Sequence, residues 1–299
     1  MTYQLYLGNR LYFSWSIAAY LMFNRFGLED QVKTTIFRPE SEAALRPMLA
    51  DLAPARTLPT AITPEGAILN DSMAIAEELA SRHPEIAFWP ADPLARGTAR
   101  ALANEMHSSF GGLRGKWPVN LRTEFATVAP PEDIVAELNR LEEIWTHARK
   151  VTGVAGPWLC GDYSLVDAIY APMATRLATY GFDTRPTTKA YVAAHLADPA
   201  LRRWRAMGLA NEAKLPAFEM PFEEVSWRGP SPMKAIAVEA GTPENNVCPY
   251  SGKEITHMLE LDGRIFGFCN AFNRLKREKT SSDESAGAAR SVCAPAEHL

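Results

Sequence analysis

The first part of the chain, residues 1–83, alternates between short apolar runs and longer runs with the spacing of an amphipathic helix. Aromatic and branched residues alternate from Tyr3 to Leu7 and predict a strand, and the apolar spacing after Ser14 predicts a helix that ends at Gly27. The same patterns predict strands at residues 32–37, 59–62 and 67–69 and helices at residues 41–52 and 72–80. Pro47 is expected to kink or shorten the first of these two helices. The order strand, helix, strand, helix, strand, strand, helix indicates a mixed sheet with helices on both faces.

Two short motifs in this part combine a proline, an acid and a hydroxyl. A strand is expected to begin at Pro59, directly after Leu58, and Asp71-Ser72 stands at the start of the third helix. The free N–H groups and the positive dipole end of a helix attract a carboxylate, and the Asp71 carboxylate can hold an ammonium nearby. These features predict a site for a small zwitterionic peptide. An ordinary N-cap is the other interpretation of Asp71 and Ser72, because both residue types are favoured caps.

These motifs, together with the stretch LGNRLYFSWS at residues 7–16, resemble the glutathione transferase superfamily. The serine-rich stretch is similar to a bacterial branch close to the zeta class. The resemblance implies an α/β thioredoxin-like domain that binds glutathione at residues 1–83 and an all-α substrate domain at residues 92–210. It covers about two thirds of the chain and implies the glutathione transferase architecture.

The resemblance also implies how glutathione is held. The bond before Pro59 is expected to be cis, so that the backbone of Leu58 hydrogen-bonds the cysteinyl part of glutathione. Asp71 and Ser72 are expected to take the γ-glutamyl end, which agrees with the peptide site inferred from the residues alone. Glutathione would then be a co-substrate, and a small electrophile would be the second substrate.

The sulfur of glutathione must lose its proton, and a hydroxyl at the start of the first helix can favour the anion. A free thiol ionises near pH 8.5, so only a few per cent is thiolate at neutral pH. A hydrogen bond to the sulfur and the positive helix end both lower the thiol pKa. We expect Ser14 to be the catalytic hydroxyl, because Ser16 is better placed to cap the helix.

The related branch tends to carry two adjacent serines where this chain has Phe13-Ser14. If the catalytic hydroxyl belongs at position 13, the activity would be weak, or Ser14 or Tyr12 would have replaced it. A plain capping role for Ser14 stays open as the alternative.

The second substrate is expected to bind between the two domains, against a helix predicted at residues 95–110. Met106 and Phe110 are expected on one face of that helix, where they would form an adaptable apolar wall. Arg114 could hold an anionic group, and His107 could act as an acid or base near neutral pH. The alternative places Met106 and Phe110 in the core. In that case His107 is a satisfied hydrogen-bond partner and Arg114 is paired to an acid.

Helices are predicted throughout the rest of this domain. Ser164 and Asp167 have the form of a capping box, with a hydroxyl first and an acid three residues later, and their expected role is in folding. Cys160 follows an apolar pair and is predicted to be a buried small hydrophobe. The remaining helices are expected at residues 132–151, from 165 onward, at 187–196 and at 198–207.

The last part of the chain has no place in the transferase pattern. Residues 211–245 are rich in proline and lack periodicity, so they are interpreted as a linker or a strap over the body. Residues 246–279 resemble a small knuckle domain of the YHS type, a β-hairpin and helix appendage with strands expected at 255–261 and 265–268. Residues 280–299 are rich in Ser, Ala and Glu and are predicted to be disordered.

Two cysteines in this appendage, Cys248 and Cys269, would make half of a tetrahedral zinc site. Ser251 and Asn273 stand where further ligands would be expected, and both are poor zinc ligands. His257 could supply a third ligand, but it lies in the middle of a predicted strand. We therefore expect a degenerate module without a metal.

The composition favours a cytoplasmic protein that acts on small molecules. A net charge of −4 does not indicate a nucleic-acid partner, and no apolar run approaches the roughly 18 residues of a membrane span. The first residues lack the pattern of a signal peptide, and four cysteines do not suggest a disulfide framework, so a reducing cytosol is expected. Relatives of this kind usually pair, so a homodimer is expected.

Two functions are compatible with these patterns. In the first, the protein is an enzyme that presents the glutathione thiolate to a small electrophile for conjugation or isomerisation. In the second, the transferase-like body is a non-catalytic scaffold, and the C-terminal module binds a partner or a metal. Phe13 and the appended module favour the scaffold, whereas the motifs at Leu58-Pro59 and Asp71-Ser72 favour the enzyme.

Overall fold

The chain forms two compact units, of which the first comprises Met1–Leu196 and Glu212–Arg228 and the second comprises Ala197–Asn211 and Gly229–Leu299. Each unit has buried apolar residues of its own. The computed structural model describes residues 2–39, 42–153, 155–230, 235–249, 251–261, 263–271 and 274.

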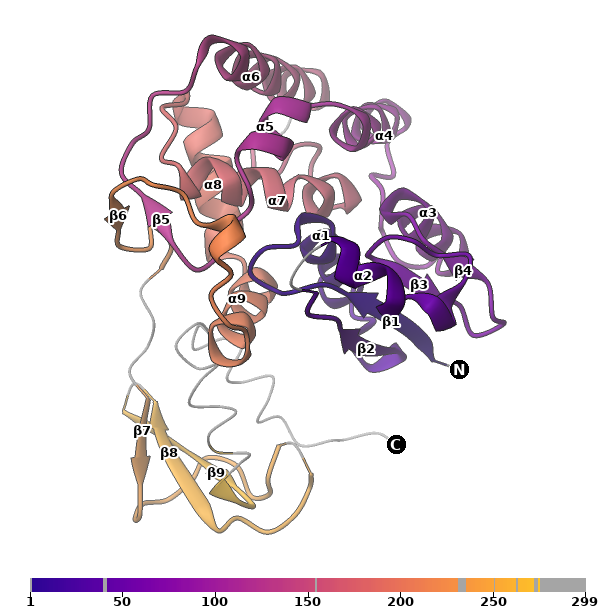
Figure 1. Ribbon diagram of the computed structural model, residues 1–299. Helices are drawn as coiled ribbons and strands as arrows, with labels where there is room; N and C mark the ends of the chain where they lie inside the picture. Colours follow the sequence, from indigo (N-terminus) through magenta and orange to yellow (C-terminus); the bar gives the residue numbers. More distant parts are fainter. Residues whose placement is uncertain are drawn as a thin grey trace. The chain divides into compact units, whose positions relative to one another are not determined.

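The first unit begins with a four-stranded mixed sheet (Figure 1). β1 runs parallel to β2 and antiparallel to β3, and β3 runs antiparallel to β4. Tyr3, Leu5 and Leu7 alternate along β1 and are buried, which is the period-two pattern of a strand. In spatial order the strands are β2 (Val32–Ile36), β1 (Tyr3–Leu7), β3 (Thr60–Ile62) and β4 (Ile68–Leu69).

Helices cover both faces of this sheet, as predicted. The Tyr3 ring meets Phe23 of α1 with 5.4 Å between the ring centroids, and α1 packs against α3. On the other face, Leu45 and Leu49 from the α2 region form an apolar cluster with Tyr6 of β1. The three helices are α1 (Ser14–Asn24), α2 (Glu42–Met48) and α3 (Ser72–Arg82).

The helix predicted at residues 41–52 is shortened, which is one of the two effects expected of Pro47. α2 ends at Met48, and a separate 3₁₀ turn follows at Ala50–Leu52. Pro47 lies inside the last turn of α2. Proline lacks a backbone N–H and its ring crowds the preceding turn, so it destabilises a regular helix around this position.

The rest of the first unit is dominated by helices (Figure 1). α7 packs against both α1 and α4, and every one of its residues from Leu165 to Thr179 is buried. It is therefore the central helix of the unit. The helices are α4 (Pro93–Ser108), α5 (Gly111–Lys116), α6 (Glu132–Thr152), α7 (Leu165–Thr179) and α8 (Pro186–Ala197).

The predicted capping box at the start of α7 is confirmed. The fully buried Asp167 carboxylate accepts hydrogen bonds from the backbone N–H groups of Ser164, at 3.0 Å, and Leu159, at 3.1 Å. It also accepts one from the Tyr191 hydroxyl at 3.0 Å. This single side chain ties α7 to the preceding loop and to α8.

The helix predicted at residues 95–110 does not include Phe110. α4 ends at Ser108, and Phe110 adopts a left-handed backbone conformation with φ of +60° before α5 begins. Met106 and Phe110 therefore do not share a helix face, although both are buried. A left-handed backbone is uncommon for a residue without glycine's freedom, so the helical spacing could not predict it.

The predicted linker at residues 211–245 contains ordered elements. Pro216–Phe218 is a 3₁₀ turn, and β6 (Glu224–Val225) pairs antiparallel with β5 (Glu124–Phe125) of the first unit. The buried Glu212 carboxylate binds Arg10 and Arg38, each at 2.7 Å. We call residues 212–228 the strap, because they belong to the first unit although α9 separates them from it in the sequence.

The second unit contains α9 (Pro199–Asn211) and a three-stranded antiparallel sheet. β8 (His257–Leu261) and β9 (Arg264–Phe268) correspond to the two predicted strands, and β7 (Ala235–Val238) adds a third within the predicted linker. Cys248 is buried in the apolar cluster of this sheet. The Cys269 Sγ lies 3.1 Å from the Ser251 Oγ.

Several sequence expectations concern residues that the structure leaves undescribed. Asn273 and residues 280–299 lie outside the described part of the chain. Within the described residues, no three His, Cys, Asp or Glu side chains group as metal ligands would. None of the described helices combines the length and apolar character needed to cross a bilayer.

Candidate active site

A cavity of about 560 Å³ in the first unit contains the predicted catalytic serine. Its walls come from the start of α1, from Leu58 before β3, from the junction of α4 and α5, and from Phe218 of the strap. Arg114 is the only charged side chain among the described lining residues. The lining residues are Tyr12, Phe13, Ser14, Trp15, Leu58, Ser108, Ser109, Gly111, Arg114, Gly115 and Phe218.

Ser14 is the first residue of α1, and its side chain is only partly buried. Its Oγ accepts a hydrogen bond from Nη2 of Arg176 at 3.2 Å. Ser16 does not have the expected capping role, because it is fully buried and its Oγ accepts a hydrogen bond from the Gly8 N–H at 2.9 Å. Phe13 occupies the N-cap position, and no side chain caps the helix. The start of α1 therefore faces the cavity without a capping carboxylate.

The hydroxyl of Tyr12, the alternative catalytic group, forms hydrogen bonds with the strap. It donates to Glu219 of the strap at 3.2 Å and accepts a hydrogen bond from the Leu215 N–H at 3.4 Å. Burial raises the pKa of Tyr12. The Phe218 ring packs against Tyr12, with 5.0 Å between centroids. Tyr12 therefore anchors the strap, and Ser14 is the better-placed donor toward the cavity.

The peptide bond between Leu58 and Pro59 is cis, as the family resemblance implied. Side-chain hydroxyls hold the surrounding loop. Thr57 Oγ1 donates to the carbonyl of Asn70 at 3.0 Å, and Thr60 Oγ1 donates to the carbonyl of Thr57 at 2.8 Å. Thr57 thus connects the loop before Pro59 with the residue that precedes Asp71.

Asp71 is the N-cap of α3 and uses both of its carboxylate oxygens. Oδ1 accepts hydrogen bonds from the N–H groups of Met73, at 2.8 Å, and Ala74, at 3.2 Å. Oδ2 lies 2.7 Å from Nε2 of His107 on α4. Ser72 is buried beside it. Asp71 therefore joins the α/β part to the helical part as well as capping its own helix.

His107 and Arg114 both lie close to the Trp15 ring. The His107 ring centroid is 5.4 Å from that of Trp15, and the Arg114 guanidinium carbon is 5.0 Å from it. Arg114 Nη1 donates to the carbonyls of Met106, His107 and Ser109 at the end of α4. Every hydrogen bond that Arg114 makes with the described residues uses Nη1, so Nε and Nη2 are open to a ligand. Burial lowers the pKa of Arg114, yet arginine stays charged at neutral pH.

The cavity brings together only part of the predicted set. Ser14, Leu58 and Arg114 line it, and His107 reaches it through Trp15. Met106 and Phe110 are 1% and 4% exposed and do not line it. Neither Pro59 nor the pair Asp71-Ser72 is among the lining residues.

Two residues near the cavity were missed by the sequence reasoning. Phe218 lies in the segment interpreted as a linker or a strap over the body. Arg176 is 1% exposed within α7, and its Nε donates to the carbonyl of Trp117 at 2.5 Å. A charged residue inside the apolar run of residues 165–179 was the available signal for Arg176.

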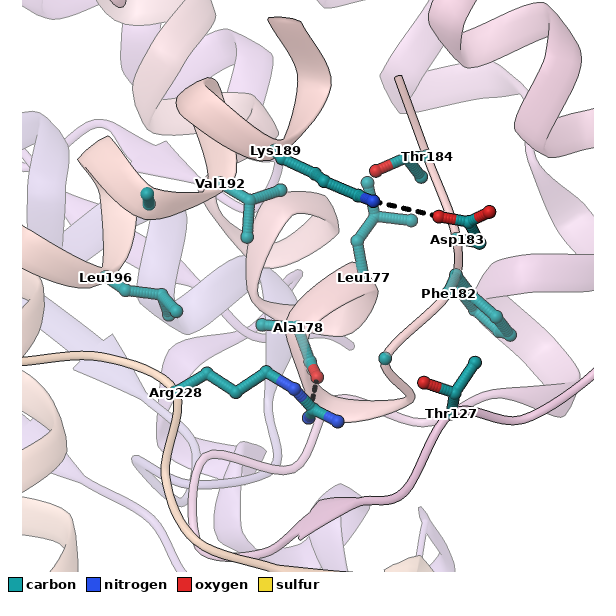
Figure 2. A pocket seen from close by; sticks show the side chains of 12 residues that line it. Thr127, Leu177, Ala178, Phe182, Asp183, Thr184, Lys189, Val192, Leu196 and Arg228 are labelled. Carbon is teal, nitrogen blue, oxygen red and sulfur yellow. Dashed lines mark hydrogen bonds and ion pairs between the residues drawn. The ribbon is translucent and has the colours of Figure 1, made fainter. Parts of the chain in front are cut away.

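A second cavity, of about 500 Å³, lies against the C-terminal end of α7 (Figure 2). Leu177 and Ala178 of α7 face Val192 and Leu196 of α8 across it, with Arg228 of the strap along one side. The Arg228 guanidinium donates to the carbonyl of Ala178 at 2.6 Å and pairs with the buried Glu124 at 3.1 Å. Lys189 binds Asp183 at 2.9 Å at the opposite side. No predicted site residue lines this cavity.

Residues 13–82 match the family model of the glutathione S-transferase N-terminal domain. None of the curated proteins matches the chain. Solved structures of similar fold include a glutathione transferase homolog from Burkholderia gl BGR1 with bound glutathione, at 21% identity and a TM-score of 0.50, covering 70% of this chain and 100% of that one.

A glutathione transferase from Methylococcus capsulatus str. Bath is 18% identical with a TM-score of 0.51, at the same coverages of 70% and 100%. Glutathione transferase Omega 3C from Trametes versicolor is 17% identical with a TM-score of 0.51, covering 69% of this chain and 88% of that one. At these identities the likeness shows the fold: a thioredoxin-like sheet domain followed by a helical domain, to which this chain adds a small antiparallel sheet.

Proposed function

We propose that the protein binds glutathione and ionises its thiol for reaction with a small electrophile, by conjugation or isomerisation. The observation that carries this proposal is the cavity at the start of α1. It combines the Ser14 hydroxyl, the residue before a cis-proline and the Arg114 guanidinium, with no carboxylate among its described lining residues. Such a site favours an anion, and its volume of about 560 Å³ suits a small molecule.

The chemistry required is a shift in the thiol equilibrium. A free thiol has a pKa near 8.5, and one charge-assisted hydrogen bond contributes about 1.5–3 kcal/mol, or about one to two pKa units. Ser14 is the proposed donor to the sulfur, and the positive end of α1 would favour the same anion. Arg114, with Nε and Nη2 open, would hold an anionic group of the second substrate.

The proposed seat for the γ-glutamyl group is the start of α3. Asp71 would bind the ammonium of the γ-glutamyl group, and the N-terminal N–H groups of α3 would attract its carboxylate. Because Asp71 Oδ2 already lies 2.7 Å from His107, the ammonium would share this oxygen with the imidazole. His107 would thus hold the Asp71 carboxylate in place for the ammonium of the ligand.

Ser14→Ala is expected to raise the pKa of the bound thiol by about one to two units, because the hydroxyl donor is lost. The thiolate absorbance of the glutathione complex, followed against pH, measures this directly. Ser81→Ala, at an exposed position of α3, is the control and should leave the titration unchanged. An unaltered titration in Ser14→Ala would remove Ser14 from the mechanism.

Asp71→Ala is expected to weaken glutathione binding at least several-fold and to destabilise the protein by about 1 kcal/mol through the lost N-cap. Asp71→Asn separates the two effects, because asparagine caps a helix as well as aspartate does but carries no charge for the ammonium. The asparagine variant should therefore keep its stability and still bind more weakly by calorimetry. Native affinity in both variants would contradict the proposed seat.

The alternative is a non-catalytic scaffold whose C-terminal module binds a partner or a metal. One observation favours it: the sheet of the second unit has a buried core of its own. The proposed transferase activity does not require this sheet. Retention on glutathione resin without turnover of any electrophile in a panel would support this alternative. A cytoplasmic homodimer is also proposed from the family resemblance, and sedimentation would test the pairing.

A further inference from the structure

A buried arginine lies directly behind the candidate catalytic serine. Arg176 extends from α7, and its guanidinium reaches Ser14 Oγ through Nη2 at 3.2 Å although the two residues are 162 positions apart. The other nitrogens donate to backbone carbonyls, Nε to Trp117 at 2.5 Å and Nη1 to Pro172 at 3.3 Å. The side chain is therefore fixed in one orientation.

Among the described residues, this guanidinium has no counter-ion. No carboxylate in the described part of the chain forms an ion pair with Arg176, although the side chain is fully buried. Buried charges in proteins are normally paired, because leaving water costs several kcal/mol per ion. Burial lowers the pKa of Arg176 to about 10, so the group still carries its charge at neutral pH. Arg114 lies close enough to oppose this charge further, and an anion bound in the cavity would relieve both.

The hydrogen bond also fixes which way the serine hydroxyl points. A guanidinium has only donors, so Ser14 Oγ must be the acceptor in this contact. The Ser14 O–H proton is then free to donate in another direction, and Ser14 lines the cavity. A hydroxyl that stabilises a thiolate must donate to it, so this orientation is the one that the chemistry needs.

We propose that Arg176 is a positioning residue for thiol ionisation, which aligns the Ser14 hydroxyl as a donor and supplies a positive charge behind it. This inference rests on the proposed function, from which we take the group that is ionised: the thiol of glutathione. Arg176 acts through Ser14 and does not itself contact the sulfur. Its role therefore differs from that of Arg114, which lines the cavity.

The first test is the pKa of glutathione bound to variants of Arg176. Arg176→Met should raise the bound thiol pKa by about one unit, a tenfold lower thiolate fraction near neutral pH, and Arg176→Lys, which keeps the charge, should give an intermediate value. The affinity for S-methylglutathione, which has no thiol to ionise, should change less than about threefold, since Arg176 does not position the peptide.

Two further variants make this test specific. Arg149 lies in α6 and, like Arg176, donates to a backbone carbonyl, that of Pro157. Arg149→Met should leave the pKa of the bound thiol unchanged. Adding Arg176→Met to Ser14→Ala should have a smaller effect than adding it to the native chain, because the action passes through Ser14. A native thiol pKa in a folded Arg176→Met variant would overturn the proposal, and so would equal effects with and without Ser14.

The second test needs no glutathione and uses Ser14→Cys. A thiol at this position would lie beside the Arg176 guanidinium, and its pKa, from the pH dependence of alkylation resolved by peptide mass spectrometry, should fall below about 7, against about 8.5 for a free thiol. Adding Arg176→Met should raise this pKa by about one unit or more.

A pKa of about 7 or above in Ser14→Cys overturns the proposal even if no Arg176 variant folds. If native protein fails to bind glutathione while Ser14→Cys gives a low pKa that Arg176→Met raises, the proposed function fails and the role of Arg176 stands. If glutathione binds and its thiol pKa ignores Arg176, only the inference fails.

Discussion

Asp167→Ala is expected to lower the free energy of unfolding by about 3–5 kcal/mol, the largest effect of any single substitution considered for this chain. The carboxylate is completely buried and accepts four hydrogen bonds, two from Ser164 through its N–H and its hydroxyl and one each from Leu159 and Tyr191. Alanine would leave buried donors unsatisfied, among them the N–H groups of Ser164 and Leu159 and the Tyr191 hydroxyl, and each such group costs about 1–3 kcal/mol. Urea unfolding at pH 7 would measure the loss.

Two companion variants show whether the acceptor is the cause. Asp167→Asn retains one side-chain oxygen and should lose about half as much stability as Asp167→Ala. Asp162→Ala removes an exposed aspartate from the same loop and should change stability by less than about 0.5 kcal/mol. If Asp167→Ala unfolded within about 1 kcal/mol of the native protein, the role of Asp167 at the start of α7 would be wrong.

His195→Phe is expected to make the protein more resistant to acid. The His195 ring is completely buried, with 4.5 Å between its centroid and that of Tyr191 and 5.1 Å between its centroid and that of Trp158. Neither ring nitrogen has a hydrogen-bond partner among the described residues. Burial lowers the pKa of His195 from 6.5 to about 3.

The sign of the pH dependence follows from this shift. Below pH 6.5 the unfolded chain protonates this histidine while the folded chain does not, so the stability present above pH 6.5 is lost as the pH falls toward 3. The slope is about 1.4 kcal/mol per pH unit at most. His195→Phe removes this dependence, so its stability relative to the native protein should grow by about 2 kcal/mol or more between pH 6.5 and 4.5.

The neighbouring Asp167 acts in the opposite direction. Burial raises the pKa of Asp167 to about 6, so protonation of Asp167 favours the folded state as the pH falls from 6 to its unfolded value of 3.8. The native protein and His195→Phe both contain Asp167. The difference between their unfolding free energies therefore reports the titration of His195. His147→Gln, at an exposed position of α6, should follow the native curve. Parallel curves for His195→Phe and the native protein would rule out a titrating role for His195.

The sequence predicted the elements whose residues are close in the chain. Alternating burial on β1, the apolar spacing of α1 and α6, and the capping box at Ser164 and Asp167 all depend on neighbours within a few positions, and periodicity reports them. Phe110 was mispredicted for the same reason, because helical spacing takes no account of a residue that leaves the helix with positive φ.

The contacts that build the candidate site are long-range, and no local pattern predicts them. Arg176 reaches Ser14 from α7, and His107 reaches Asp71 from α4. The sequence left a linker and a strap over the body as alternatives for this segment, because its strand β6 has two residues, too few to produce a period. Its contacts with the first unit include the ion pairs of Glu212, whose two arginine partners lie far back in the chain.

The position of α7 has a consequence for how the first unit would melt. This helix has no exposed residue, and it packs against α1 of the sheet domain as well as α4 of the helical domain. Neither domain can therefore unfold without exposing α7 to water. The two should therefore melt in one cooperative step, and a tripeptide bound against the sheet would protect the distant α6 from hydrogen exchange as strongly as it protects its own surroundings.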